Sequence, residues 1–195
     1  SFSGPFLGGG ADFGLLSSER EGYTQNDFTG KRVDERDGLF GRARMLWNPS
    51  AASELELAVF GENARDGGFA LSEVDGLRAN PHHIDQDFEG LTNRDVLAPS
   101  LVYRHLGDAL DFTSISAWQT WDVLETSDFD FSPIDGVRRR AEQEQTYAYQ
   151  ELRLGSAAGA RRGEWRWLAG AVSRPSGESG GGWMRPTMCA AISRP

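Results

Sequence analysis

Alternation of apolar and polar residues runs through most of the chain and predicts β-strands. The clearest example is the segment 37–47, where Ala43 and Met45 fall on one side of an extended chain while Arg42 and Arg44 fall on the other. Such period-two alternation is typical of a strand with one apolar and one polar face. About seven segments follow this rule: 11–19, 37–47, 54–63, 97–106, 110–121, 146–154 and 164–172. The sequence therefore predicts an all-β chain and no helix of normal length.

The connections between the predicted strands alternate between long and short. The polar stretches 20–36, 64–96 and 122–145 are long, compared with a median connection of about 4–6 residues. The turns at 48–50 and 107–108 are short. Outer-membrane barrels place long loops outside the cell and short turns in the periplasm, whereas a soluble meander has no reason to sort its loops by end. The predicted fold is therefore an antiparallel meander that forms part of a transmembrane β-barrel, with 122–145 as an extracellular loop.

Charged residues occupy the faces opposite the apolar rows, and in a barrel these faces would line a polar lumen. They are Arg42, Arg44, Glu54, Glu56, Glu62, Glu151 and Arg153. The same residues would face water in a one-sided soluble sheet, so this feature alone does not discriminate. Tryptophans are predicted at both ends of the strands, with Trp47, Trp165 and Trp167 on the periplasmic side and Trp118 and Trp121 on the outer side. This placement is typical of interfacial girdles, although aromatic residues are also simply common in strands.

Composition excludes several functional classes. The 195-residue chain has a formal charge of -9 and no basic stripe, which argues against nucleic-acid binding. No apolar run approaches the roughly 18–20 residues that a membrane helix needs, a test that does not apply to barrel strands. Cys189 is the single cysteine, so neither an internal disulfide nor a Cys/His zinc site is predicted. No spacing indicates a nucleophile–base pair, so we predict no enzyme, no catalytic residue and no cofactor.

Several segments, taken together and in order, resemble a known family. The segment 21–50 has a Gly-Tyr-Thr loop entry followed by a strand and a Trp-Asn-Pro turn. The segment 110–122 reads LDFTSISAWQTWD, and QELRLGS at 150–156 is followed by EWRWLAGAV at 164–172. Over residues 4–172, this order and spacing resemble the barrel of TonB-dependent outer-membrane receptors, particularly the ferric-siderophore receptor-like proteins.

The resemblance implies a function in the bacterial outer membrane. That function is active uptake of a scarce ligand, usually a ferric siderophore, with energy from the TonB–ExbB–ExbD system acting on an N-terminal plug domain. Neither a plug domain nor the remaining strands of a full barrel can be read in the sequence, so we expect an internal fragment of about seven strands whose transport function belongs to the parent protein. The partners implied are the ligand, outer-membrane lipid and, through the plug, TonB–ExbB–ExbD, but no nucleic acid.

The segment 173–195 departs from the pattern of that family. It is rich in Gly, Ser, Pro and Arg and has no strand period. We predict that the partial barrel occupies 1–172 and that 173–195 is an irregular tail, out of frame or truncated. An ordinary unstructured tail is the alternative.

Two other functions remain open from the sequence. A secreted or periplasmic β-sandwich that binds carbohydrate or protein would need short turns at both ends, which the long connections disfavour. A non-energised outer-membrane porin or adhesin would share the strand pattern, and an upstream plug domain of about 100–150 residues would distinguish the receptor from it.

Three groups in the long connections carry candidate binding chemistry. His82, His83, Asp85 and Asp87 could bind a metal or contact an iron chelate, with a solvated loop as the alternative. Asp128, Asp130 and Asp135 resemble a calcium loop but lack the glycine and terminal glutamate of an EF-hand. The run Arg138 to Arg140 could attract an anionic siderophore, or could be a solvated charge run. We assign no metal ligand from these patterns and leave the ligand-binding residues undetermined.

Overall fold

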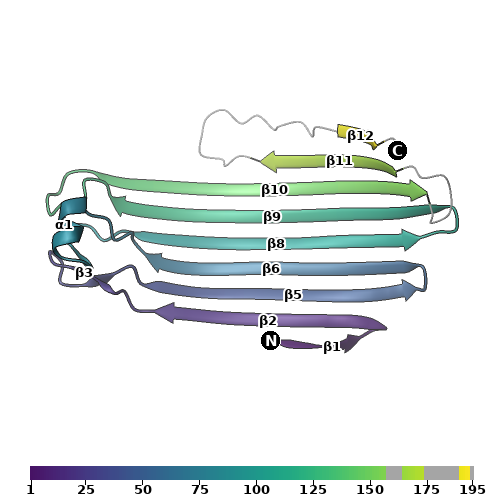
Figure 1. The fold of residues 1–195 in the computed structure, drawn as a ribbon, viewed down its shortest axis with the longest axis horizontal. Helices are drawn as coiled ribbons and strands as arrows, with labels where there is room; N and C mark the ends of the chain where they lie inside the picture. Colours follow the sequence, from purple (N-terminus) through teal and green to yellow (C-terminus); the bar gives the residue numbers. More distant parts are fainter. Residues whose placement is uncertain (157–163, 174–188, 194–195) are drawn as a thin grey trace.

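A nine-stranded antiparallel sheet dominates the computed structural model, which describes residues 1–156, 164–173 and 189–193 (Figure 1). Its strands, in order across the sheet, are β1 (Phe2–Phe6), β2 (Gly9–Arg20), β5 (Arg36–Ser50), β6 (Ser53–Gly67), β8 (Leu91–Leu106), β9 (Leu110–Asp128), β10 (Arg138–Ser156), β11 (Glu164–Ser173) and β12 (Cys189–Ser193). A second sheet contains three short strands, β4 (Arg32–Val33), β3 (Thr24–Asn26) and β7 (His83–Ile84). One short helix, α1 (Val74–Ala79), precedes β7.

The predicted antiparallel meander is confirmed. Each predicted strand is present and pairs with the next one along the chain, without a crossover. β1 and β12 are additional short strands at the two edges, so the described part of the sheet is open and not a closed barrel. β12 lies within 173–195, where the sequence predicts no strand. Its five residues are too few to show alternation, and pairing with β11 supplies backbone hydrogen bonds whatever the side chains are. The segments 174–188 and 194–195 lie outside the described residues.

The strands extend further than apolar alternation predicts, and the expectation that 122–145 is a loop is wrong over most of its length. β9 continues to Asp128 and β10 begins at Arg138, so only 129–137 connects them. The two strands pair throughout this region, from Trp121 opposite Gln145 to Asp128 opposite Arg138. Polar side chains on both faces of these extensions hide the period, while the backbone ladder continues unchanged.

The predicted sorting of connections by length is confirmed for the connections that the structure describes. At one end of the sheet, 21–35, 68–90 and 129–137 form what we call the long-connection end (Figure 1). At the other, the short-connection end, 7–8, 51–52 and 107–109 join neighbouring strands. Leu7 and Gly8 both have positive φ, 47° and 76°, the geometry of a two-residue hairpin turn whose twist matches that of the strands.

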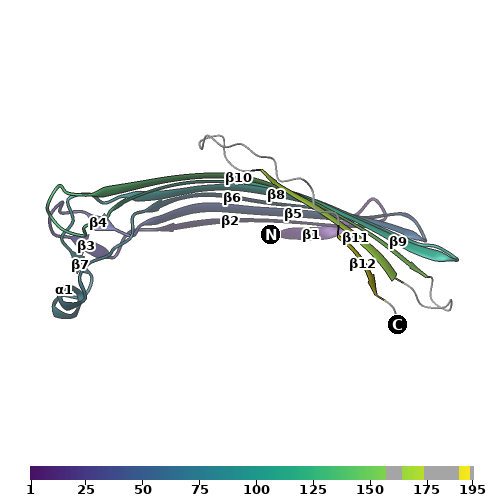
Figure 2. The same ribbon diagram turned by 90° about the horizontal axis from the view of Figure 1, so that it is seen from above.

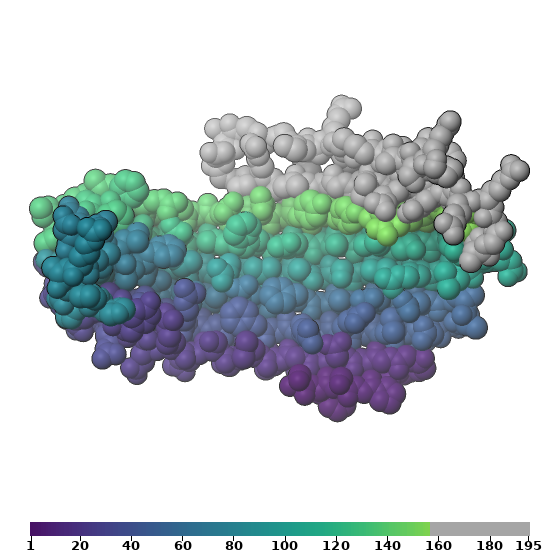
Figure 3. Space-filling view, viewed as in Figure 1, coloured from purple at the N-terminus to yellow at the C-terminus, as the bar shows by residue number. Residues whose placement is uncertain are grey.

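The main sheet is a single layer without a core of its own. Figure 2 shows it edge-on as one curved layer, with α1 and the second sheet gathered at the long-connection end, and Figure 3 shows one of its broad faces. Among the described residues, the buried hydrophobic side chains are Val33, Ala64 and Ile84. Two of these belong to the second sheet. A one-layer sheet leaves both faces without protein partners, so its stability depends on what covers those faces.

In the described part of the chain, no helix is both long enough and apolar enough to cross a membrane.

Candidate functional site

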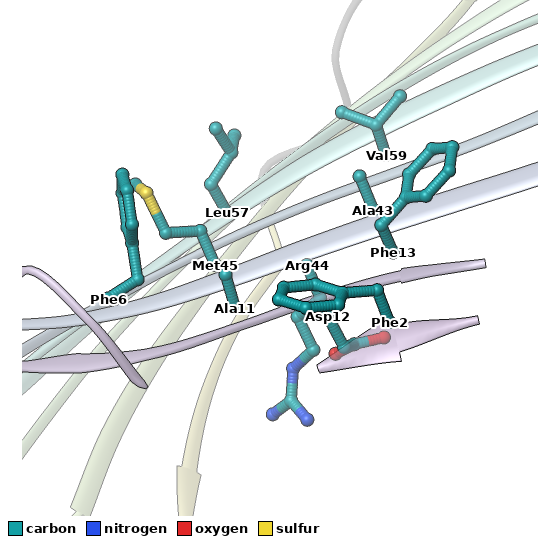
Figure 4. A pocket seen from close by; sticks show the side chains of 10 residues that line it. All are labelled: Phe2, Phe6, Ala11, Asp12, Phe13, Ala43, Arg44, Met45, Leu57 and Val59. Carbon is teal, nitrogen blue, oxygen red and sulfur yellow. The ribbon is translucent and has the colours of Figure 1, made fainter. Parts of the chain in front are cut away.

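The strand register divides the main sheet into two chemically different faces. Directly paired residues point to the same face. Phe13 pairs with Ala43, Ala43 with Val59, and Val59 with Pro99, which defines an apolar face. The polar face carries the predicted charged residues, all seven of which share it: Arg42, Arg44, Glu54, Glu56, Glu62, Glu151 and Arg153. Figure 4 shows the two sides together, with Leu57, Val59 and Phe13 on one and Arg44 and Asp12 on the other.

The charges on the polar face pair across the strands. Arg44 Nε lies 2.8 Å from Glu56 Oε1, and Glu56 also lies 3.6 Å from Arg104. Arg104 contacts Glu54 on the neighbouring strand. Further ion pairs on this face join Arg42 to Asp12 at 3.6 Å, Arg94 to Glu62 and Arg153 to Glu151. Ion pairs exposed to water contribute about 0–1 kcal/mol each to stability. The same charges would be costly in contact with hydrocarbon, so this face requires a polar environment.

The apolar face is exposed and shallowly hollowed. Leu57, Leu97 and Leu101 are 39%, 45% and 39% exposed, although each is a large aliphatic residue in the middle of a long strand. Beside β1, a hollow of about 260 Å³ opens between Phe2, Phe6 and the neighbouring strands (Figure 4). The side chains that line this hollow on the apolar face are apolar and include no reactive group. It is therefore a surface for an apolar partner and not a reactive site.

Trp121 departs from its predicted place in an outer aromatic girdle. Trp118 lies on the apolar face and is 40% exposed. Trp121 lies three residues further along β9 and therefore on the polar face, where it pairs with Gln145. Both tryptophans lie within β9 and not at its end, because the strand continues to Asp128. Trp47 lies close to the short-connection end, as predicted, while the side chains of Trp165 and Trp167 lie outside the described part of the structure.

Buried amides join two of the long connections. Asn26 is 0% exposed. Its Nδ2 donates to the carbonyl oxygen of Gln86 at 2.9 Å, and its Oδ1 accepts from the Gln86 backbone N–H at 3.1 Å. The side chain of Gln86 donates to the Leu71 carbonyl oxygen at 2.6 Å. The third connection is attached through the Asp87 N–H, which donates to the Ser132 carbonyl oxygen at 3.1 Å. The long-connection end is therefore one hydrogen-bonded unit, which sequence patterns did not predict.

The first predicted binding group does not converge on one point. The group comprises His82, His83, Asp85 and Asp87. His83 Nδ1 lies 2.8 Å from Asp27 Oδ1, and the His82 ring packs edge-on against Tyr23 with centroids 5.3 Å apart. Asp87 instead pairs with Arg138 at 2.7 Å. Within the described residues, no group of three or more His, Cys, Asp and Glu side chains is arranged to hold a metal ion.

The second group, Asp128, Asp130 and Asp135, mainly organises the turn at 129–137. Asp128 Oδ1 accepts from the backbone N–H groups of Asp130 and Phe131, at 3.0 and 3.2 Å. Burial raises the pKa of Asp128, which is 3% exposed and whose Oδ2 has no hydrogen-bond partner in the described part of the chain. Hydrogen bonds from the Ser132 hydroxyl and the Val137 N–H lower the pKa of Asp130. Asp135 turns away to pair with Arg138 at 3.1 Å.

The third group, Arg138 to Arg140, is already paired with carboxylates. Arg138 lies between Asp87 and Asp135 and over the ring of Phe88, 4.9 Å from its centroid. The hydrogen bond to Asp87 raises the pKa of Arg138. Arg139 pairs with Glu125 and Arg140 with Glu142. These arginines therefore stabilise the ends of the β9–β10 hairpin, and none of them presents an unpaired charge to a ligand.

A small hollow on the polar face was not predicted from the sequence. It measures about 160 Å³ and is lined by Gln119, Trp121, Gln145 and Tyr147. Of these residues only Gln145 falls in the segment expected to be a loop. The other three lie in predicted strands, and the register of β9 and β10, which alternation does not predict, brings all four together.

Comparisons with known proteins identify the fold. No family model matches the chain. The crystal structure of the ferric yersiniabactin uptake receptor FyuA from Yersinia pestis superimposes on it with a TM-score of 0.62 and 20% sequence identity. The similarity covers 89% of this chain and 29% of the receptor, so the chain spans less than a third of the receptor's length. The chain thus has the fold of part of a TonB-dependent receptor, which confirms at the level of fold the resemblance that its sequence motifs indicate.

Proposed function

We propose that the chain forms part of the wall of a bacterial outer-membrane receptor that takes up a ferric siderophore or a similarly scarce ligand. The observation that carries this proposal is the two-faced meander, with an exposed apolar face, an ion-paired polar face and long connections at one end only. The fold similarity to a ferric yersiniabactin uptake receptor supports it.

The two faces suit the two environments of a barrel wall. Lipid would cover the exposed leucines of the apolar face, which have no protein partner in the described structure. Water in the lumen would solvate the ion pairs on the polar face. The alternative soluble β-sandwich needs a second sheet packed about 10 Å away on the apolar face, and the described residues contain no such sheet.

The long-connection end would face the outside of the cell. Its connections are joined by buried hydrogen bonds, so they would hold a defined shape at the mouth of the barrel. Loops held on a rigid scaffold commonly carry recognition. The short-connection end would face the periplasm, where a plug domain of the complete protein would engage TonB–ExbB–ExbD.

Transport would belong to the complete protein and not to these 195 residues. An open sheet in a bilayer leaves edge N–H and C=O groups unsatisfied at several kcal/mol each. The described sheet has two such edges, at β1 and β12. We therefore expect no ligand-dependent uptake from this chain alone.

Iron uptake tests the proposal. The complete protein encoded by the gene that contains this chain is expressed in iron-limited cells that lack their own siderophore receptors. Accumulation of ⁵⁵Fe is then measured with a panel of ferric chelates, in cells with and without TonB. The proposal predicts uptake of at least one chelate that stops when TonB is absent. Uptake that is equal in both strains would favour a non-energised porin, and no uptake of any chelate would refute the receptor function.

A further inference from the structure

We propose that Gln119, Trp121, Gln145 and Tyr147 form a ligand-contact patch for an uncharged, planar aromatic part of the transported ligand that also offers a hydrogen-bond acceptor. The inference rests on the proposed uptake function and adds the chemical class of the ligand. It concerns the hollow of about 160 Å³ on the polar face between β9 and β10.

The register places the four side chains together. Gln119 pairs directly with Tyr147, and Trp121 pairs directly with Gln145, so the patch consists of two adjacent cross-strand pairs on one face. Side chains opposite each other in this way are close enough to contact one ligand.

Acidic residues on the apolar face show where the patch lies along the strands. Asp122 pairs with both Asp95 and Glu144, so a row of acidic residues crosses the apolar face next to Trp121. Such a row ends the segment that lipid can cover. The patch therefore lies at the mouth of the lumen, just inside the long connections.

Trp121 supplies a hydrogen-bond donor that lacks an acceptor. Its Nε1 is buried and has no hydrogen-bond partner within the described part of the chain. An indole N–H can only donate, and a buried donor without an acceptor is unfavourable. A ligand whose acceptor oxygen or nitrogen displaces the atoms that now cover this N–H would remove that cost.

Tyr147 supplies an aromatic surface beside that donor. Its ring lies nearly parallel to the ring of Tyr149, with an interplanar angle of 18° and centroids 6.4 Å apart. The hydroxyl of Tyr149 donates to Glu151, whereas the hydroxyl of Tyr147 makes no hydrogen bond to any described residue. Tyr147 is 38% exposed, so its ring is accessible for stacking with another planar group.

Charge on either side of the patch is already neutralised. On the polar face, Glu125 pairs with Arg139 towards the long-connection end, and Glu151 pairs with Arg153 in the other direction. The patch itself contains two amides, an indole and a phenol, and none of these is charged at neutral pH. This composition fits a ring with an attached acceptor better than it fits a carboxylate or phosphate.

Paired substitutions in the complete receptor test this assignment. Trp121→Phe keeps a ring and removes the donor, Tyr147→Leu removes the stacking surface, and Trp118→Phe is the matched control on the opposite face of the same strand. Binding of two iron complexes is measured on cells at 0 °C, where energised transport does not contribute. The probes are the ferric complex of benzohydroxamate, a neutral complex that carries phenyl rings beside carbonyl oxygens, and ferrioxamine B, whose chelator carries no ring.

We expect Trp121→Phe to weaken binding of the aromatic complex about two- to tenfold, as loss of one hydrogen bond would. Tyr147→Leu should weaken it about two- to tenfold through loss of stacking. Trp118→Phe should leave it unchanged, and none of the variants should change any binding of ferrioxamine B. The melting temperature of Trp121→Phe should be no lower than that of wild type, because the substitution removes a buried donor without a partner.

Three results would overturn the assignment. The first is a receptor that takes up ferric chelates but binds the aromatic complex equally well in all variants. The second is equal weakening for both probes or lower thermal stability of Trp121→Phe, either of which would show that another part of the protein covers the patch. The third is a wild-type receptor that takes up only non-aromatic chelates. Absence of uptake for every chelate would instead refute the proposed function.

Discussion

Leu101→Arg and Val102→Arg should differ sharply in their effect on stability, because under the proposed function these neighbouring residues of one strand would face lipid and lumen, respectively. Leu101 lies on the apolar face opposite Leu57, and Val102 lies on the polar face opposite Glu56. Leu101 is five residues from the end of β8 at Leu106, about 17 Å along a strand at about 3.4 Å per residue. A tilt of about 45° converts this into about 12 Å of depth, close to the middle of an apolar band about 25 Å tall.

At that depth an arginine that faces lipid costs about 2–4 kcal/mol, or roughly 30- to 1000-fold in the folding equilibrium. An arginine at 102 meets lumen water and the carboxylate of Glu56, so its cost should be within about 1 kcal/mol of zero. The free-energy cost of each substitution is measured by urea unfolding of the complete protein in lipid vesicles, with tryptophan fluorescence as the signal. Equal costs for the two variants, or a larger cost for Val102→Arg, would refute the assignment of faces.

Two further predictions concern the long-connection end. Burial raises the pKa of Asp128 above its ordinary value of 3.8, so the folded protein keeps the proton on this carboxyl up to a higher pH than the unfolded chain does. The stabilisation that this bound proton gives the folded protein is present below pH 3.8. It is lost as pH rises from there through the higher folded pKa, so the melting temperature should fall over that range. Asp128→Asn should remove this fall in melting temperature, while Asp128→Ala should cost about 1–3 kcal/mol more than Asp128→Asn, because the Asp130 and Phe131 N–H groups lose their acceptor. Gly90→Ala should destabilise the complete protein more than Gly30→Ala, as measured by thermal unfolding. Both glycines have φ of +73°, but a Cβ at 90 would lie 2.3 Å from the Thr126 carbonyl oxygen and one at 30 would meet nothing within 4 Å.

Sequence alternation predicted the faces of the strands better than their ends. In 39–47 every second residue is apolar or glycine, because one face of that segment belongs to the apolar face and the other carries Arg42 and Arg44. Beyond Trp121 both faces of β9 and β10 carry polar residues, so apolar periodicity ends before the strands do. Alternation also could not reveal the patch around Trp121, since its four residues come together only through the pairing register of β9 and β10.

The second sheet could not be predicted from local pattern. β4 and β7 contain two residues each, and β3 contains three, too few for any period to appear. Their pairing depends on Asn26 and Gln86, which are far apart in the chain. The Asn26 side-chain amide donates to the Gln86 carbonyl oxygen and accepts from the Gln86 backbone N–H. The same long-range packing separated the candidate metal residues, because His83 pairs with Asp27 and Asp87 pairs with Arg138.

Labelling of single cysteines in intact cells tests the membrane orientation most directly. In a Cys189→Ser background of the complete protein, Ile134→Cys places a thiol in the connection 129–137, where Ile134 is 69% exposed. Ala51→Cys places one in the turn 51–52 at the opposite end. With a membrane-impermeant maleimide, Ile134→Cys should be labelled in intact cells, and Ala51→Cys only after the outer membrane is permeabilised. Equal labelling of both thiols in intact cells, or labelling of Ala51→Cys alone, would contradict a chain that spans the outer membrane with its long connections outside.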